Sequence, residues 1–242
     1  MCTVTYIPVN GKYFITSNRD EKNVRTTALV PAVYEINSKK LIYPKDTTAG
    51  GTWIALHENG NAAVLLNGAF EKHIPQSSYR SSRGIILLDI ISNERPAWYF
   101  HQLDLSGIEP FTLILLEQET LNECRWDEKK KYSKQLKKHR PYIWSSVTLY
   151  DKDIVNKREQ WFADFLNNNS NPTQQDILTF HQFSGDEDRS NNLVMKRDTI
   201  YSTVSITSLL VTTDRGSMKY LDLKNKKVSE RKIELQGSFQ ER

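Results

Sequence analysis

The stretch CTVTYIPVNGKYFITSNRDE, residues 2–21, predicts a β-hairpin from which the rest of the fold is built outward. Asn10-Gly11 is a preferred pair for a type I′ turn, and β-branched and aromatic residues flank it on both sides. In an antiparallel hairpin the end of the second strand lies beside the start of the first. We therefore expect Asn18, Arg19 and Asp20 to lie close to Cys2.

Cys2 is the candidate nucleophile of this hairpin. It follows Met1 directly, and methionine aminopeptidases generally remove Met when a small residue such as cysteine follows. The processed Cys2 would carry a thiol and a free α-amine, whose reference pKa values are about 8.5 and about 7.7–8.0. Such a residue combines a nucleophile with a base.

A second hairpin has the same design. Strands are expected at residues 53–56 and 62–66, on either side of Asn59-Gly60, and the pair Gly50-Gly51 precedes them. Its strand ends should bring Gly51 and Asn67 together, as the first hairpin does for Cys2 and Asp20.

The remaining pattern indicates an α+β protein. We expect helices at residues 81–93, 151–167 and 173–183, and strands at residues 111–116, 122–132, 143–149, 199–212, 218–223 and 227–235. Helices between runs of antiparallel strands favour a layered fold. Two sheets with helices outside satisfy the burial requirement, although these patterns alone do not select that architecture over a two-layer one.

Length and composition set limits on the function. The chain has 242 residues, 38% hydrophobic and 26% charged, and no linker, so we expect one domain over residues 1–242. The net charge of +4 arises largely in residues 129–140, which we expect to form a solvated strand edge or loop and not a nucleic-acid interface. No apolar stretch reaches about 18 residues, so no membrane span is expected.

The cysteine and histidine spacing argues against a metal site. Cys2 and Cys124 are the only cysteines, and without a secretory signal they indicate reduced thiols, with Cys124 a bystander. Neither a Cys-x-x-Cys nor a His-x-x-x-His spacing occurs. We expect a cytoplasmic protein with no cofactor and no metal.

Residues 18–21, Asn-Arg-Asp-Glu, spell the signature of the NRDE family, also called the transport and Golgi organisation family. Further family motifs strengthen the resemblance: an initial Met-Cys, a Gly-Gly-Thr-Trp segment, an Asn that closes the next hairpin, an Arg-Gly that opens the next helix, and a late Tyr-x-Thr strand. In this chain they are Met1-Cys2, Gly50-Gly51-Thr52-Trp53, Asn67, Arg83-Gly84 and Tyr201-Ser202-Thr203.

The family is similar to the N-terminal-nucleophile hydrolase superfamily, so the resemblance implies a four-layer αββα sandwich of two mainly antiparallel sheets flanked by helices. Cysteine members of that superfamily cleave amide bonds outside peptides, in conjugated bile salts, penicillins or N-acyl lipids. The resemblance implies that Cys2 attacks the carbonyl while Arg19 and Asp20 polarise and orient its thiol and amine. Asn67 would donate to the oxyanion.

The chain departs from the family pattern at two positions. Many relatives carry Asn near Ser146 and Arg at the position of Val204, and Arg197 or Lys196 is a candidate to replace that lost charge. The candidate binding residues are Asn18, Trp53, Ser146 and Val204. Structural alternatives stay open: Arg19 and Asp20 as a polar turn, Trp53 as a core residue, and Asn67 as an ordinary strand end.

Two functions fit these observations. The first is an N-terminal-cysteine hydrolase that acts on a non-peptide C–N amide bond of a small acylated substrate. The alternative is a non-catalytic family member that binds a hydrophobic or amphipathic ligand, in keeping with the family's association with lipid- or haem-related trafficking. Val204 favours the second function, because it would make the pocket wall more apolar.

Overall fold

Two antiparallel seven-stranded sheets form the centre of the fold, in the part of the chain that the computed structural model describes: residues 2–118 (the Cys2 side chain excepted), 120–197 and 199–236. The first sheet runs in the order β10 (Tyr142–Ser145), β1 (Cys2–Val9), β2 (Lys12–Lys22), β12 (Tyr201–Val211), β13 (Arg215–Asp222) and β14 (Lys227–Glu234), and β11 (Lys196–Arg197) pairs with β12. The second sheet follows chain order: β3 (Leu29–Ile36), β4 (Lys39–Lys45), β5 (Ile54–His57), β6 (Ala62–Asn67), β7 (Phe111–Glu117), β8 (Thr120–Trp126) and β9 (Lys131–Leu136).

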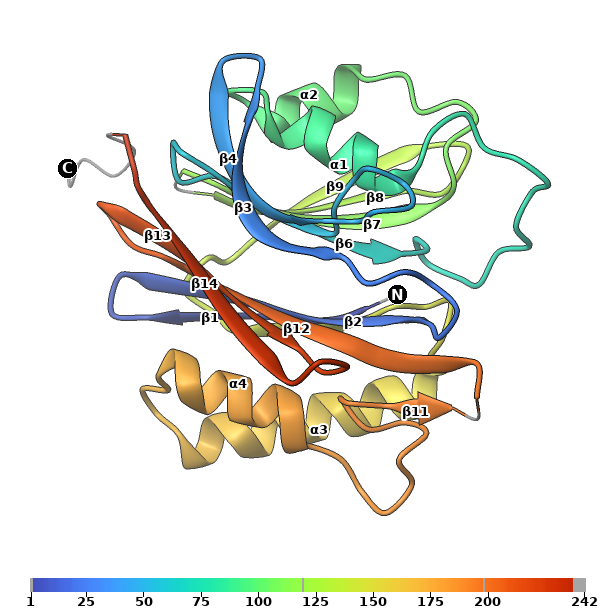
Figure 1. Ribbon diagram of the computed structural model, residues 1–242, viewed down its shortest axis with the longest axis vertical. Coiled ribbons are helices and arrows are strands. Elements are labelled where there is room, and N and C mark those ends of the chain that lie inside the picture. The colour runs from blue at the N-terminus through green and yellow to red at the C-terminus, as the bar shows by residue number, and fades with distance from the viewer. Residues whose placement is uncertain (1, 119, 198, 237–242) are drawn as a thin grey trace.

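Helices cover the outer face of each sheet, which gives the four layers seen in Figure 1. The second sheet carries α1 (Arg83–Ile91) and α2 (Pro96–Gln102), and the first carries α3 (Lys152–Asn168) and α4 (Gln174–Phe183). The expected αββα sandwich is therefore confirmed. Three apolar cores separate the layers: one between the sheets around Tyr6 and Ile54, and one beneath each helix pair. Within the described residues, no helix combines the length and the apolar character that crossing a membrane requires.

The first hairpin forms as expected. Asn10 and Gly11 have φ angles of 47° and 74°, the left-handed values that a type I′ turn needs. The register pairs Cys2 with Arg19, so the start of β1 lies against the end of β2. The predicted proximity of residues 18–20 to Cys2 is confirmed for the backbone.

Alternation along β2 separates these neighbours onto two faces. Ile15 and Arg19 face the second sheet, where Ile15 joins the central core and Arg19 contacts Trp53. Phe14, Asn18 and Asp20 face the helix layer, since side chains in a strand point alternately to opposite sides. Arg19 and Asp20 therefore cannot act as one side-by-side pair on a single face.

Several expected boundaries were wrong. The strand expected at 122–132 is two strands, because the Asp127 carboxylate accepts hydrogen bonds from the amides of Lys129 and Lys130 and turns the chain between β8 and β9. The strand expected at 143–149 ends at Ser145, where residues 146–149 form a turn. Four elements, β3, β4, β11 and α2, were not expected from the sequence, and α1 begins two residues later than expected, with Ser82 as its cap.

Candidate active site

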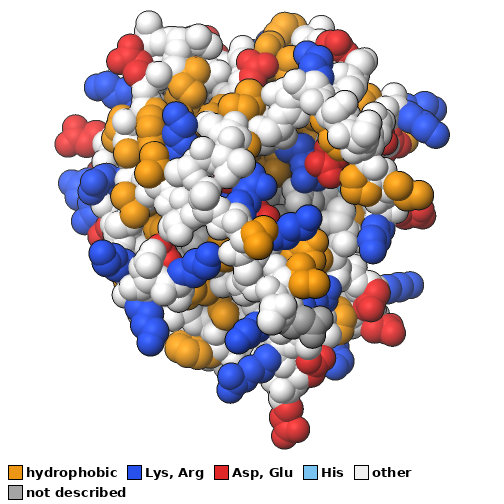
Figure 2. Space-filling model, turned by 45° about the vertical axis from the view of Figure 1, so that its right-hand side comes forward, with side chains coloured by type: hydrophobic (Ala, Val, Ile, Leu, Met, Phe, Trp, Pro, Cys, Tyr) orange, Lys and Arg blue, Asp and Glu red, His pale blue; other side chains and the backbone are white. Residues whose placement is uncertain are grey.

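A cavity of about 590 Å³ opens beside the paired ends of β1 and β2. Both sheets, the N-terminus of α1 and the irregular segment 68–82 contribute to its lining. Figure 2 shows this hollowed face, with Lys and Arg side chains in and around the hollow. The residues with charged or titratable side chains that line the cavity are Arg19, Glu21, Lys22, Arg25, Asp46, Lys72, His73, Arg83, Glu109, Arg197 and Tyr201.

Two glycine motifs pack backbone against backbone at one wall of the cavity. A Cβ atom on Gly51 would lie 2.4 Å from the carbonyl carbon of Gly84, and one on Gly84 would lie 2.7 Å from the carbonyl oxygen of Thr52. The amide of Thr52 donates to the carbonyl of Gly84 at 3.3 Å. Glycine is therefore required at both positions for α1 to approach the β5–β6 hairpin, which explains why both motifs border the site.

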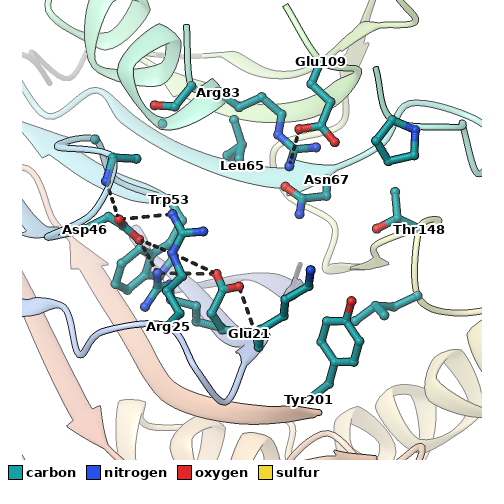
Figure 3. A pocket seen from close by; sticks show the side chains of 18 of the residues that line it. Glu21, Arg25, Asp46, Trp53, Leu65, Asn67, Arg83, Glu109, Thr148 and Tyr201 are labelled. Atoms are coloured by element: carbon teal, nitrogen blue, oxygen red, sulfur yellow. Dashed lines mark hydrogen bonds and ion pairs between the residues drawn. The ribbon is translucent and has the colours of Figure 1, made fainter. Parts of the chain in front are cut away.

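Arg19 belongs to a cluster of charges at the cavity wall, in which Figure 3 labels Glu21, Arg25 and Asp46. Its guanidinium donates to the Asp46 carboxylate, lies 3.5 Å from Glu21 and stacks on Trp53 at 4.3 Å. Arg25 donates to the same Asp46 carboxylate at 3.0 and 3.2 Å. Burial tends to raise the pKa of Asp46, but the hydrogen bonds from Arg25 and a backbone amide, with the charge of Arg19, lower it below its ordinary value. Arg19 is thus a buried cation held at the cavity.

Trp53 lies both in the core and at the cavity wall. Its side chain belongs to the central core and also lines the cavity, and only 5% of it is exposed. Its indole Nε1 has no hydrogen-bond partner among the described residues. The ring supports Arg19 from one side, so it orients the guanidinium as well as packing.

Asn67 ends β6 at the cavity, and its amide points into the open space in Figure 3. The hydroxyl of Ser146 donates to the Asn67 backbone carbonyl at 2.8 Å and lies 2.9 Å from the hydroxyl of Thr148. Ser146 is only 1% exposed and is not among the lining residues. Its place is therefore behind Asn67, where it holds the strand end.

A second charged cluster lies on the α1 side of the cavity. Glu109 contacts the Arg83 guanidinium at 2.9 Å and the His73 Nε2 at 3.1 Å. Arg83 also donates to the carbonyl of Pro110 at 3.2 Å. The Glu109 carboxylate is thereby fully engaged with cationic and polar neighbours.

Asp20 lies in a buried network on the opposite side of β2. It is fully buried and accepts hydrogen bonds from the hydroxyls of Tyr150 at 2.7 Å and Thr203 at 2.6 Å. Burial raises the pKa of Asp20, and the charge of Arg158 opposes that rise. Arg158 stacks on Tyr150 at 3.6 Å and donates to the hydroxyl of Thr3, the residue after Cys2. Asp20 therefore supports the strand end from behind and does not line the cavity.

Asn18 is part of the same layer and is likewise absent from the cavity lining. Its amide nitrogen donates to the carbonyls of His181 and Leu193 at 3.0 and 2.6 Å, and its oxygen lies 2.5 Å from His181 Nδ1. The other ring nitrogen of His181 lies 2.8 Å from the hydroxyl of Thr5. Burial lowers the pKa of His181 to about 3. Asn18 therefore connects β2 to α4 through hydrogen bonds.

Val204 does not form the apolar cavity wall that the sequence suggested. It sits at a β-bulge between Thr203 and Ser205 and lines a smaller, separate cavity with Arg19 and Arg25. The bulge adds one residue to β12 and thereby shifts its register against β2. Arg197, one of the two candidates for the missing charge, lines the large cavity, and Lys196 does not.

Sequence reasoning missed several lining residues, among them Asp46, His73 and Glu109. Asp46 lies in the turn after β4, and the segment 68–82 that carries His73 has no regular structure. Their neighbours in space are distant in the sequence, so no local spacing connects them. The sequence indicated Arg83 only as part of the Arg83-Gly84 motif, and no motif pointed to its partner Glu109.

Known proteins with solved structures share this fold at low sequence identity. A C2A mutant of conjugated bile acid hydrolase from Clostridium perfringens matches with a TM-score of 0.60 and 9% identity, over 96% of this chain and 92% of that chain. An arginine-to-leucine variant of the same hydrolase matches at 0.60 and 9%, over 100% and 99%. The Caenorhabditis elegans ortholog of N-acylethanolamine-hydrolyzing acid amidase matches at 0.52 and 10%, over 86% and 92%.

Comparisons of the sequence identify a family but no curated relative. No curated protein matches the chain significantly. One family description does match: Transport and Golgi organisation 2, over residues 1–224. This match spans all the motifs at the cavity and confirms the resemblance that residues 18–21 indicated.

Proposed function

The chain belongs to the Transport and Golgi organisation 2 family, and from the cavity beside β1 we propose that it is a cysteine amide hydrolase of the N-terminal-nucleophile type. The proposed substrate is a small acylated compound with a non-peptide C–N amide bond. One observation carries the proposal: the strand register pairs Cys2 with Arg19, and the side chain of Arg19 lines a cavity large enough for a small molecule.

The proposed reaction begins when Met1 is absent and Cys2 has a free α-amine. The α-amine takes the thiol proton as the sulfur attacks the amide carbonyl carbon, and it then gives that proton to the departing amine. The C–N bond breaks and leaves a thioester on Cys2. A water molecule attacks this thioester, which releases the carboxylic acid and restores the thiol.

The surrounding residues have separate roles in this proposal. Arg19 favours the thiolate through its charge, and the contacts with Asp46 and Trp53 keep it in place. Asn67 presents an amide to the cavity and donates to the oxyanion, a contact worth about 2.7–4 kcal/mol in measured cases. Asp20 is a positioning residue, since it braces the β2 end from the helix side.

The charge of the cavity argues against a purely hydrophobic ligand. Nine charged side chains line it, and transferring them from water onto an apolar molecule would be costly. The lining therefore favours a polar or amphipathic substrate over a hydrophobic one.

Mass spectrometry on the intact protein tests the proposal directly. We expect purified native protein to lack Met1 and to gain the mass of an acyl group on Cys2 when it is incubated with reactive N-acyl compounds. Turnover of an N-acyl substrate, followed by release of its amine, should be lost in Cys2→Ala.

Cys124 provides a matched control. It is buried in the second sheet, and burial raises the pKa of its thiol to about 12, so it should remain unmodified. Cys124→Ala should keep both acylation and turnover. Retained Met1 in active protein, or full turnover by Cys2→Ala, would show that Cys2 is not the nucleophile.

A further inference from the structure

The cavity has more positive charge than its own carboxylates neutralise. Each lining carboxylate is already engaged with arginine: Asp46 and Glu21 with Arg19 and Arg25, and Glu109 with Arg83. Among the described residues, no carboxylate pairs with the three remaining lining cations, which are Lys22, Lys72 and Arg197. Unpaired charge of one sign in a concave site concentrates ligands of the opposite sign.

Two of these cations lie in a row across three neighbouring strands. The register pairs Tyr201 of β12 with Lys22 of β2 on one side and with Arg197 of β11 on the other. Directly opposed residues in antiparallel strands share a face, and all three residues line the cavity. We call Lys22, Tyr201 and Arg197 the basic row.

The members of the basic row are free to act on a ligand. The Tyr201 hydroxyl points into the cavity (Figure 3) and has no hydrogen-bond partner among the described residues. Lys22 is exposed, and in the described structure its side chain makes no hydrogen bond or ion pair. The Arg197 guanidinium donates to the carbonyls of Leu149 and Ser190 and to the side chain of Asn191, and it lies 5.2 Å from the centre of the Tyr150 ring. These contacts fix its position, and no carboxylate of the described residues pairs with its charge.

We propose that the basic row is an oxyanion subsite, and that the ligand of this cavity carries a carboxylate or phosphate group besides its amide. Two cations that flank a hydroxyl donor match an oxygen anion with several acceptor positions. The amide group of the ligand rests on the proposed function, whereas the binding of the anion does not depend on it. Arg197, which β11 brings to this cavity, is one of the two candidates for the charge that the family pattern has at the position of Val204.

Binding to full-length Cys2→Ala protein separates this inference from catalysis. The probes are N-dodecanoylglycine and its neutral counterpart N-dodecanoylglycinamide, compared by calorimetry. We expect the carboxylate probe to bind at least about tenfold more tightly than the neutral probe. Lys22→Gln should reduce this ratio of affinities by about tenfold. Tyr201→Phe should reduce the same preference, and added salt should weaken the carboxylate probe alone.

Lys227→Gln on β14 is the matched control, because Lys227 is equally exposed and lies outside the cavity. It should leave both affinities unchanged. Competition by acetate or by inorganic phosphate identifies which oxyanion the row prefers, and displacement by either supports the subsite. Equal binding of the two probes, or equal effects of Lys22→Gln and Lys227→Gln, would overturn it. If wild-type protein shows no turnover but the preference for the carboxylate probe remains, the proposed hydrolase activity is wrong and the oxyanion subsite stands.

Discussion

Replacing His181 with Gln should flatten the dependence of stability on pH. His181 is fully buried beneath the first sheet, where it lies between Asn18 and Thr5. The Asn18 oxygen faces Nδ1, and the Asn18 amide nitrogen is already committed to two carbonyls. Nδ1 is therefore the protonated nitrogen of a neutral ring, and Nε2 accepts from Thr5.

The pKa values determine the size of the effect. Burial, together with the nearby charge of Arg158, lowers the pKa of His181 from 6.5 to about 3. The unfolded chain then binds this proton more readily than the folded protein. The contribution to stability is complete above about pH 6.5 and falls as the pH drops toward 3. The resulting loss is about 2 kcal/mol at about pH 5 and about 3 kcal/mol at about pH 4.

Urea titrations followed by tryptophan fluorescence measure this loss. The free energy of unfolding of wild type, His181→Gln and His139→Gln is compared at several values between about pH 7 and pH 4. His139 is exposed, so its variant should keep the wild-type dependence. His181→Gln is expected to be less stable at pH 7 but to lose about 2 kcal/mol less between pH 7 and pH 5.

Parallel curves for wild type and His181→Gln would refute this reasoning. Such a result would mean that His181 has the same pKa in the folded and unfolded protein. A ring titration near pH 6.5 by nuclear magnetic resonance would lead to the same conclusion. The two measurements are independent, since the second needs no unfolding.

Two further predictions concern the walls of the cavity. Asp46→Asn removes the closer of the two carboxylates that Arg19 and Arg25 share and should lower the free energy of unfolding by about 3 kcal/mol in urea titrations; a change under about 0.5 kcal/mol would mean that solvent replaces the pair, as at a surface site. Gly84→Ala places a Cβ atom 2.7 Å from the carbonyl oxygen of Thr52 and should cost about 2 kcal/mol in the same assay. Wild-type stability of that variant would contradict the close contact between α1 and the β5–β6 hairpin.

Local sequence signals predicted many of the strands and helices. The turn pair Asn10-Gly11 specifies the register of β1 and β2, because only a few backbone conformations close a two-residue hairpin. The start of α4, expected at residue 173, is fixed by a capping box in which Thr173 and Asp176 exchange hydrogen bonds. Where the local signal was weak, as at α2 and β3, the prediction failed.

The face on which each site residue lies required more than the hairpin. Adjacency in sequence suggested that Arg19 and Asp20 act together, but strand alternation sends Arg19 toward the second sheet and Asp20 toward Tyr150. The chain alone does not show which layer covers which face of β2. Both faces of this strand are buried, so its hydrophobic pattern has no simple period.

The sequence by itself determined the hairpin that brings Cys2 to Arg19, the family, and the four-layer fold that the family implies. Only the tertiary structure decided the chemistry of the cavity. Its charges come from segments as distant as Lys22, Glu109 and Arg197, and each is paired or unpaired according to which strands and loops meet there. Ion pairing depends on distances of a few ångströms between such segments, and no local pattern in the chain encodes those distances.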